Sequence, residues 1–206
     1  MILKKIAILG QPPIEIKMII NNNYCSIDSP ITFRGNSSVW MAILLCFVIF
    51  PGAVFAAESF SDAAKQVKIY RMQADYKKNF PDVADFSSDQ ILQLGDRNLI
   101  VLVDTRGKKE QEVSIIPGAI TEREFLQNPL IYQNYIIIAY CTIGLRSCKL
   151  AQKFTKKGIS IFNLSGGILA WLHAGGSVHK DGKPVNRVHV YGRKWDLAPA
   201  GMESVW

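Results

Sequence analysis

The chain has 206 residues, a formal net charge of +7 and four cysteines. This length suits one domain with a proper core and a tail, and does not favour two domains. The positive charge is scattered without a basic block or interleaved aromatic residues, so we expect no nucleic-acid partner. Four irregularly spaced cysteines match neither a disulfide framework nor a zinc site. A mildly basic domain of this kind suits small anionic molecules.

The first part of the chain, residues 1–57, predicts an N-terminal extension that ends in a secretory signal peptide. Residues 39–50 are an unbroken apolar run, which is short for a membrane span and suits the apolar core of a signal peptide. Small residues then precede a predicted cut after Ala56 or Ala57. We therefore expect an exported, periplasmic protein that contacts a membrane only through this segment. The alternative is a membrane anchor formed by residues 39–57.

A helical lead-in is predicted for residues 58–85. Apolar residues at helical spacing indicate a first helix that ends near Asn79. A second, short helix begins at Ser87 or Ser88, which can cap it, and is ended by Gly95. Both helices are expected to pack against the domain without a chemical role.

The first buried strand covers residues 99–103 and ends on Asp104. A carboxylate at this edge of a sheet belongs either to a site or to a loop anchor. Anchoring is favoured, because no second carboxylate is spaced to share acid–base chemistry with it. Arg106 and the charged residues after it predict a solvated loop or short helix. A turn at residues 116–119 then leads into a short strand near Ile120.

The central motif is a cysteine between a strand and a helix. A helix predicted for residues 122–127 precedes it, and the apolar run Tyr135–Tyr140 then predicts a strand buried on both faces. Cys141 follows this strand directly. From Ser147 the apolar positions lie three and four apart, which predicts an amphipathic helix that Gly158 ends.

The loop after Cys141 has the features of an anion-binding thiolate site. Its backbone N–H groups and the positive end of the following helix converge near the sulfur. Gly144 allows unusual backbone conformations, and Arg146 adds a fixed positive charge. Cys141 alone would equally suit a buried strand-end cysteine, since free cysteine is often buried. The glycine, arginine and serine that follow favour a nucleophile. The predicted binding residues of the loop are Thr142, Ile143, Gly144, Leu145, Arg146 and Ser147.

The remaining elements complete an alternating pattern of strands and helices. Residues 159–162 predict a strand, and Gly166 and Gly167 open a short helix. This alternation predicts an α/β fold with a central, mainly parallel sheet flanked by helices on both faces. The tail, residues 177–206, shows no strong period, and its aromatic residues predict that it packs on the domain. The three histidines lack ligand spacing, so no metal is expected.

Three separated motifs of this sequence resemble the rhodanese-like domain, over residues 86–176. The first is an apolar strand that ends in Asp, any residue and Arg, followed by Glu110 and the turn at residues 116–119. The other two are the cysteine loop and a closing Gly-Gly and Trp motif. Their residues are Val101, Leu102, Val103, Asp104, Thr105, Arg106, Glu110, Ile116, Pro117, Gly118, Ala119, Tyr140, Cys141, Gly144, Arg146, Ser147, Leu164, Gly166, Gly167, Ile168, Ala170 and Trp171.

The resemblance implies a sulfurtransferase without a cofactor. Cys141 would take a sulfane sulfur from thiosulfate or a persulfide donor, and would pass it as a persulfide to cyanide, a thiol or a protein acceptor. Loop amides from Thr142 to Ser147 would hold the anion, with Asp104 and Arg106 in support. Arg146 would either bind the leaving sulfite or tie down the loop through a carboxylate such as Asp104.

Several alternatives stay open at this point. A module that only carries or senses sulfane sulfur would use the same persulfide. Phosphatases on the same fold have five residues between Cys and Arg, whereas four separate Cys141 from Arg146 here, which favours sulfur. The family often has Gly-His where this chain has Ser114 and Ile115. Cys148 is either a small buried residue or a resolving thiol for Cys141.

Overall fold

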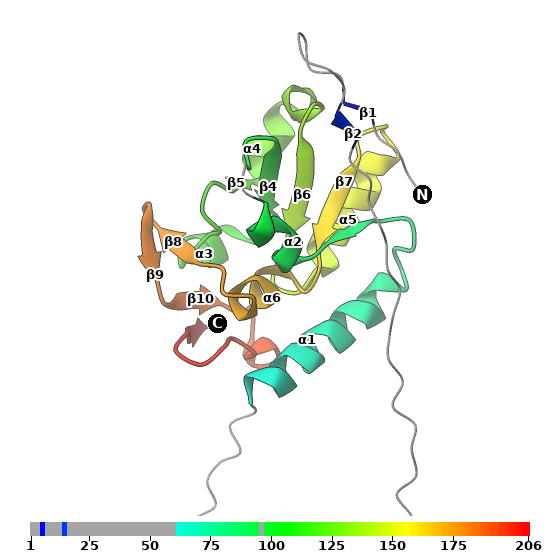
Figure 1. The fold of residues 1–206 in the computed structure, drawn as a ribbon. Coiled ribbons are helices and arrows are strands. Elements are labelled where there is room, and N and C mark those ends of the chain that lie inside the picture. The colour runs from blue at the N-terminus through cyan, green and yellow to red at the C-terminus, as the bar shows by residue number, and fades with distance from the viewer. Residues whose placement is uncertain (1–4, 7–13, 16–60, 95–96) are drawn as a thin grey trace, which may run out of the picture. The chain divides into compact units, whose positions relative to one another are not determined.

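The computed structural model describes residues 5–6, 14–15, 61–94 and 97–206 (Figure 1). The chain divides into two compact units, residues 1–59 and 60–206. In the first unit, β1 (Lys5–Ile6) pairs antiparallel with β2 (Ile14–Glu15). The predicted signal peptide and its cut after Ala56 or Ala57 lie outside the described residues and stay predictions. Within the described ranges, no helix has both the length and the apolar character needed to cross a membrane.

The second unit is built on a parallel sheet of five strands in the order β3-β7-β6-β4-β5. Its strands are β3 (Asp85–Phe86), β4 (Ile100–Asp104), β5 (Ile120–Thr121), β6 (Ile136–Tyr140) and β7 (Ile161–Leu164). The central strands β4, β6 and β7 are rich in β-branched residues, which fit a sheet that is covered on both faces.

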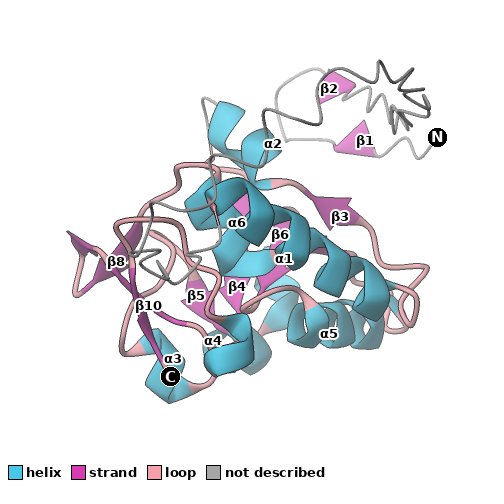
Figure 2. Ribbon diagram, turned by 90° about the horizontal axis from the view of Figure 1, so that it is seen from below, coloured by secondary structure: helices cyan, strands magenta, loops and turns pink. Residues whose placement is uncertain are grey.

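Helices connect these strands and cover both faces of the sheet. They are α1 (Asp62–Lys77), α2 (Ser88–Gln93), α3 (Lys108–Gln111), α4 (Glu122–Gln127), α5 (Leu145–Thr155) and α6 (Gly167–His173), with 3-10 turns η1 (Pro129–Tyr132) and η2 (Arg193–Trp195). The helices α4 and α5 lie on the face opposite α6 (Figure 2). The predicted α/β class, with a parallel sheet flanked on both faces, is therefore confirmed.

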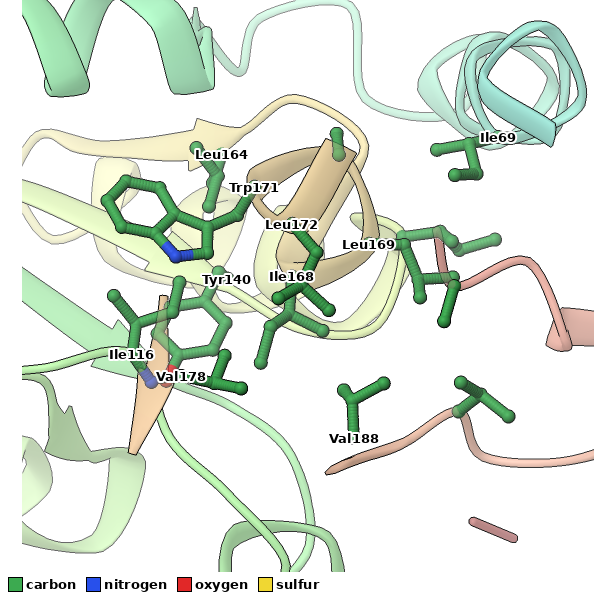
Figure 3. Close-up of a cluster of buried hydrophobic side chains, with 14 of the residues drawn as sticks. Ile69, Ile116, Tyr140, Leu164, Ile168, Leu169, Trp171, Leu172, Val178 and Val188 are labelled. Atoms are coloured by element: carbon green, nitrogen blue, oxygen red, sulfur yellow. Dashed lines mark hydrogen bonds between the residues drawn. The ribbon is translucent and has the colours of Figure 1, made fainter. Parts of the chain in front are cut away.

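Alternation along the central strands divides the core into two clusters. Ile138 of β6 points to the cluster that contains α6, whereas its neighbours Ile137 and Ala139 point to the cluster that contains α5. In the first cluster, the buried rings of Tyr140 and Trp171 pack near Ile116 and Val178 (Figure 3). The Tyr140 hydroxyl accepts a hydrogen bond from the Ile116 N–H at 3.1 Å, so this buried polar group has a partner.

Local capping explains where the early helices begin. Ser61 caps α1, because its hydroxyl accepts a hydrogen bond from the Ala64 N–H at 3.3 Å. Ser87 caps α2 through a reciprocal pair of hydrogen bonds with Gln90. The helix predicted to end near Asn79 ends two residues earlier, at Lys77. Gly95, which was predicted to end the second helix, lies outside the described residues.

The C-terminal segment, residues 177–206, contains more secondary structure than the absence of hydrophobic periodicity in its sequence predicts. It forms an antiparallel pair, β8 (Val178–Lys180) with β9 (Lys183–Val185), and a parallel pair, β10 (Arg187–His189) with β11 (Glu203–Val205). Val188 and Val190 are fully buried in the same cluster as α6. These strands have three residues each, which is too short for alternation to be read from sequence.

The start of α6 lies against the residues that follow β6. A Cβ atom added at Gly167 would lie 2.4 Å from the carbonyl oxygen of Cys141 and 2.6 Å from that of Thr142. Gly167 also has φ of 59°, a conformation that favours glycine. The close approach of two backbones here therefore requires glycine.

We expect Gly167→Ala to destabilise the protein by at least about 3 kcal/mol, because backbone strain adds to a clash that no side chain can relieve. Gly158→Ala is the matched control, since Gly158 has φ of 80° but nothing within 4 Å of an added Cβ. Strain alone should cost that variant about 1–2 kcal/mol. Urea unfolding of both variants measures the difference, and equal losses would contradict the close-packing argument.

Candidate active site

Cys141 lies at the carboxyl end of β6, in the centre of the sheet. Its side chain is 2% exposed, and its sulfur accepts a hydrogen bond from the Gly144 N–H at 3.1 Å. Gly144 makes this turn possible, because its φ of 115° is a left-handed value that other residues rarely adopt. The backbone after the strand thus curls around the sulfur.

The helix behind the loop begins two residues earlier than the sequence predicts. Since α5 starts at Leu145, the residues Leu145, Arg146 and Ser147 form its first turn rather than an irregular loop. The N–H groups of a first helical turn have no partner inside the helix, and the helix dipole places partial positive charge there. These groups and the loop amides therefore offer hydrogen bonds to an anion beside Cys141.

The start of α6 fixes the orientation of the loop peptides. The Ile168 N–H donates to the carbonyl of Cys141 at 2.9 Å, and the Leu169 N–H donates to the carbonyl of Thr142 at 3.3 Å. These two carbonyls therefore point away from the sulfur, toward α6. Because a peptide's N–H points opposite to its C=O, the N–H groups of Thr142 and Ile143 point away from α6.

Arg146 ties the loop to α3. Its guanidinium donates to both carboxylate oxygens of Glu110, at 2.5 and 2.8 Å, and to the Thr142 hydroxyl at 3.1 Å. Burial would raise the pKa of Glu110, but hydrogen bonds from Arg146 and the Gly107 N–H outweigh it and hold this pKa below its ordinary value. Of the two roles predicted for Arg146, tying down the loop is the one that its contacts serve. The carboxylate is Glu110, so the suggestion of Asp104 is wrong.

Asp104 and Arg106 form a separate buried ion pair. The Arg106 Nη2 lies 2.7 Å from an Asp104 oxygen and 2.6 Å from the carbonyl oxygen of Ser114, to which it also donates. The Tyr140 hydroxyl donates to Asp104 at 2.8 Å. Asp104 thus anchors the loop after β4, and the prediction that Arg106 lies in a solvated segment is wrong, since its side chain is fully buried.

Of the other predicted loop residues, Ile143 and Leu145 use their side chains for packing, whereas the Ser147 hydroxyl lies within hydrogen-bond distance of the sulfur. Ile143 is buried in the cluster that contains α6, and Leu145 packs against the opposite cluster. Only their backbone N–H groups can serve a ligand. The Ser147 hydroxyl donates to the Asn163 side chain at 2.7 Å and lies 3.8 Å from the Cys141 sulfur. Asn163 in turn donates to Asp85 at 2.8 Å.

Cys148 lies in the apolar cluster on the α5 face, with Phe125 and Phe154 among its members. Burial raises the pKa of Cys148 to about 12, with a smaller contribution from the charge of Asp85. Both cysteines are free thiols in the structure. Because only a thiolate attacks, these surroundings favour a packing role for Cys148 over a resolving one.

The C-terminal segment contributes two side chains that the sequence did not indicate. The Tyr191 ring lies over Arg146, 5.1 Å from the guanidinium carbon to the ring centroid. His189 accepts a hydrogen bond from the Tyr191 N–H on its Nδ1 at 3.0 Å. Burial lowers the pKa of His189, and the charges of Arg106 and Arg146 lower it further against the opposing effect of Glu110. The sequence of residues 177–206 has no hydrophobic periodicity, so it did not indicate that these two side chains lie near Arg146.

Within the part of the chain that the structure describes, no group of three or more His, Cys, Asp and Glu residues is arranged to hold a metal ion. The site combines Cys141, the Gly144 N–H, the first turn of α5 and two arginines with their carboxylates. This fold and this site define an α/β domain in which a thiol sits in an amide-lined loop at the end of a central parallel strand.

The family model of the rhodanese-like domain matches residues 87–174. These matched residues include the cysteine loop and α6. Tyr191 and the whole of α1 lie outside the matched residues. No curated protein matches the sequence.

Solved structures similar to this chain include three from different organisms. A protein of unknown function described as a possible tyrosine phosphatase, from Rhodopseudomonas palustris, is 23% identical over 54% of this chain and 93% of its own, with a TM-score of 0.43. A rhodanese-related protein from Thermoplasma volcanium is 19% identical over 47% of this chain and 97% of its own, with a TM-score of 0.41. A thiosulfate sulfurtransferase from Pseudomonas aeruginosa is 20% identical over 58% of this chain and 23% of its own, with a TM-score of 0.43.

We expect Glu110→Gln to destabilise the protein by about 1–3 kcal/mol at neutral pH, since it removes the charge that Arg146 binds. The pKa of Glu110 is lowered by folding, so its stabilisation is present above the unfolded pKa and is lost as the pH falls through the folded one. The difference in the free energy of unfolding between the variant and the wild type should therefore become smaller as the pH is lowered to about 3. Urea unfolding at both pH values measures it.

Glu112→Gln is the control for this prediction, because Glu112 is an exposed neighbour whose ion pair with Lys108 lies on the surface. It should change stability by less than about 0.5 kcal/mol. A Glu110→Gln variant as stable as this control would contradict the proposed clamp.

Cys148 should stay unmodified when the native protein is treated with iodoacetate near pH of about 8, because its thiol remains protonated and buried. Cys141 should react first. Trypsin cleaves after Arg146 and so separates the two cysteines into different peptides, whose masses report each label. Equal labelling of the two, or a disulfide between them after air oxidation, would show that Cys148 is an available thiol.

Proposed function

We propose that this protein is a sulfurtransferase that moves a sulfane sulfur through a persulfide on Cys141. The observation that carries the proposal is the position of the sulfur, which accepts a hydrogen bond from the Gly144 N–H at the start of α5. A thiolate or persulfide anion at this position is stabilised by the Gly144 N–H and by the first turn of α5. The family match supports the same chemistry.

The reaction proceeds in two displacements at sulfur. The Cys141 thiolate attacks the outer sulfur of thiosulfate, a new S–S bond forms, the donor S–S bond breaks, and sulfite leaves with the electron pair. A thiophilic acceptor such as cyanide or a thiolate then attacks the outer sulfur of the Cys141 persulfide. Thiocyanate or a new persulfide leaves, and the Cys141 thiolate is regenerated.

The other site residues position the loop. Arg146 is bound on its hydrogen-bonding edge by Glu110, so it fixes the first turn of α5 and contributes charge without leaving its partner. Asp104 and Arg106 hold the neighbouring loop after β4. The backbone amides then bind the oxyanion of the donor, and their orientation is set before the substrate binds.

The intact mass of the protein tests this proposal directly. We expect thiosulfate to add one sulfur atom to the wild type, cyanide to remove it, and Cys141→Ser to gain nothing. Cys148→Ala is the matched control and should load and unload like the wild type. Absence of loading on the wild type would contradict the proposal.

Turnover separates the enzyme from a carrier or sensor. Repeated formation of thiocyanate from thiosulfate and cyanide, many times per protein molecule, is the expected result. A single stoichiometric loading without turnover would favour the carrier instead. Hydrolysis of an aryl phosphate at a comparable rate would overturn the preference for sulfur over phosphate.

A further inference from the structure

The aromatic rim, which we define as Tyr191 and Trp195, lies beside the cysteine loop and outside the residues that match the family. The Tyr191 ring covers a face of the Arg146 guanidinium, and Trp195 meets Tyr191 edge-on with ring centroids 5.1 Å apart. Arg146 is also near enough to Cys141 for the sulfur's charge to act on it. The rim therefore places aromatic surface against Arg146, which donates to the hydroxyl of Thr142, the residue after Cys141.

Tyr191 holds this position at a cost in backbone energy. Among the non-glycine residues that the structure describes, only Asp181 and Tyr191 have positive φ, and the value at Tyr191 is 69°. The hydrogen bond from its N–H to His189 fixes the conformation. Its side chain is nevertheless 58% exposed, so core packing does not require it. Strain at an exposed residue beside a reactive group is typical of a functional position.

The charges around the loop do not favour a doubly charged ion. Glu110 neutralises Arg146 and Asp104 neutralises Arg106. Glu122, which is half-buried, adds another carboxylate close enough to interact with Arg146. The attraction for an anion then comes mainly from the N–H groups at the start of α5, which carry about half a unit of positive charge. This suits one negative charge better than two.

We propose that the aromatic rim is a subsite for the organic part of a singly charged sulfane donor, so that an organic persulfide or thiosulfonate is a better donor than thiosulfate. This inference rests on the proposed sulfur transfer at Cys141 and names the substrate class of that site. A small inorganic ion needs only the loop amides, whereas the exposed face of Tyr191 adds affinity only for a donor that carries apolar atoms.

The chemical step keeps the same balance with such a donor. The Cys141 thiolate attacks the terminal sulfur of R–S–S⁻, the new S–S bond forms, and R–S⁻ leaves with the electron pair of the broken bond. For a thiosulfonate, R–SO₂–S⁻, the leaving group is the sulfinate R–SO₂⁻. In both cases a neutral sulfur atom is transferred and one negative charge remains on each product.

Two thiosulfonates that differ only in the organic group provide the test. Benzenethiosulfonate and methanethiosulfonate carry the same single charge and the same reacting sulfur, but only the first has a ring. The rate of persulfide formation on the full-length protein is followed by intact mass, with thiosulfate as the third donor. Each rate is divided by the rate of the same donor with free cysteine, which removes differences in intrinsic reactivity.

Three variants separate the ring from its surroundings. Tyr191→Gly removes the ring and suits the left-handed backbone, and Tyr191→Phe keeps the ring without the hydroxyl. Tyr135→Gly is the matched control, because Tyr135 is an exposed tyrosine that precedes β6 and so lies at the end of the strand opposite Cys141.

We expect the wild type to prefer benzenethiosulfonate to methanethiosulfonate, and both to thiosulfate, after normalisation. Tyr191→Gly should lower the ratio of the two thiosulfonate rates about three- to tenfold, as expected for the loss of one aromatic contact. Tyr191→Phe and Tyr135→Gly should keep the wild-type ratio.

The outcomes that oppose this inference are distinct from those that oppose the proposed function. If the wild type loads sulfur but Tyr191→Gly keeps the ratio, or thiosulfate is the best donor after normalisation, the subsite is wrong and sulfur transfer stands. If none of the three donors loads Cys141, the proposed function is wrong and the subsite falls with it.

Discussion

The site depends on the direction of two peptide groups. The first turn of α6 binds the carbonyls of Cys141 and Thr142, and Gly167 allows the two backbones to approach closely enough for this. The Gly144 N–H donates to the sulfur, and the first turn of α5 and the nearby Arg146 add positive charge beside it. Arg146 and Glu110 then hold the ring of amides in place from the outside.

This arrangement explains why the charged residues of the site are paired rather than free. A free arginine beside a thiolate would bind any anion, whereas a paired one mainly sets geometry. The C-terminal segment adds the Tyr191 ring over Arg146, and His189 accepts a hydrogen bond from the Tyr191 N–H. The cysteine loop thus lies within the residues that match the family model, and a segment beyond that match adds side chains beside it.

Sequence patterns predicted the sheet and the position of Cys141, because a run such as Tyr135–Tyr140 is specific for a strand buried on both faces. They did not reveal that Glu110 is the partner of Arg146. That contact joins residues 36 positions apart through a helix of four residues, which has no periodicity to detect. The position of Tyr191 could not be predicted for a related reason. Its left-handed backbone conformation depends on the hydrogen bond to His189 and on packing against Arg146.

The buried cluster around α6 includes Val188, Val190, Leu197 and Ala198 from near the end of the chain, and Ile69 from its first long helix. The Lys65 ammonium and the Asp62 carboxylate of that helix bind backbone groups of Ala198 and Ala200. During synthesis, the apolar side of α1 therefore stays uncovered until residues 188–198 have left the ribosome. The time for which this side of α1 stays exposed is therefore set by how long translation of the intervening residues takes.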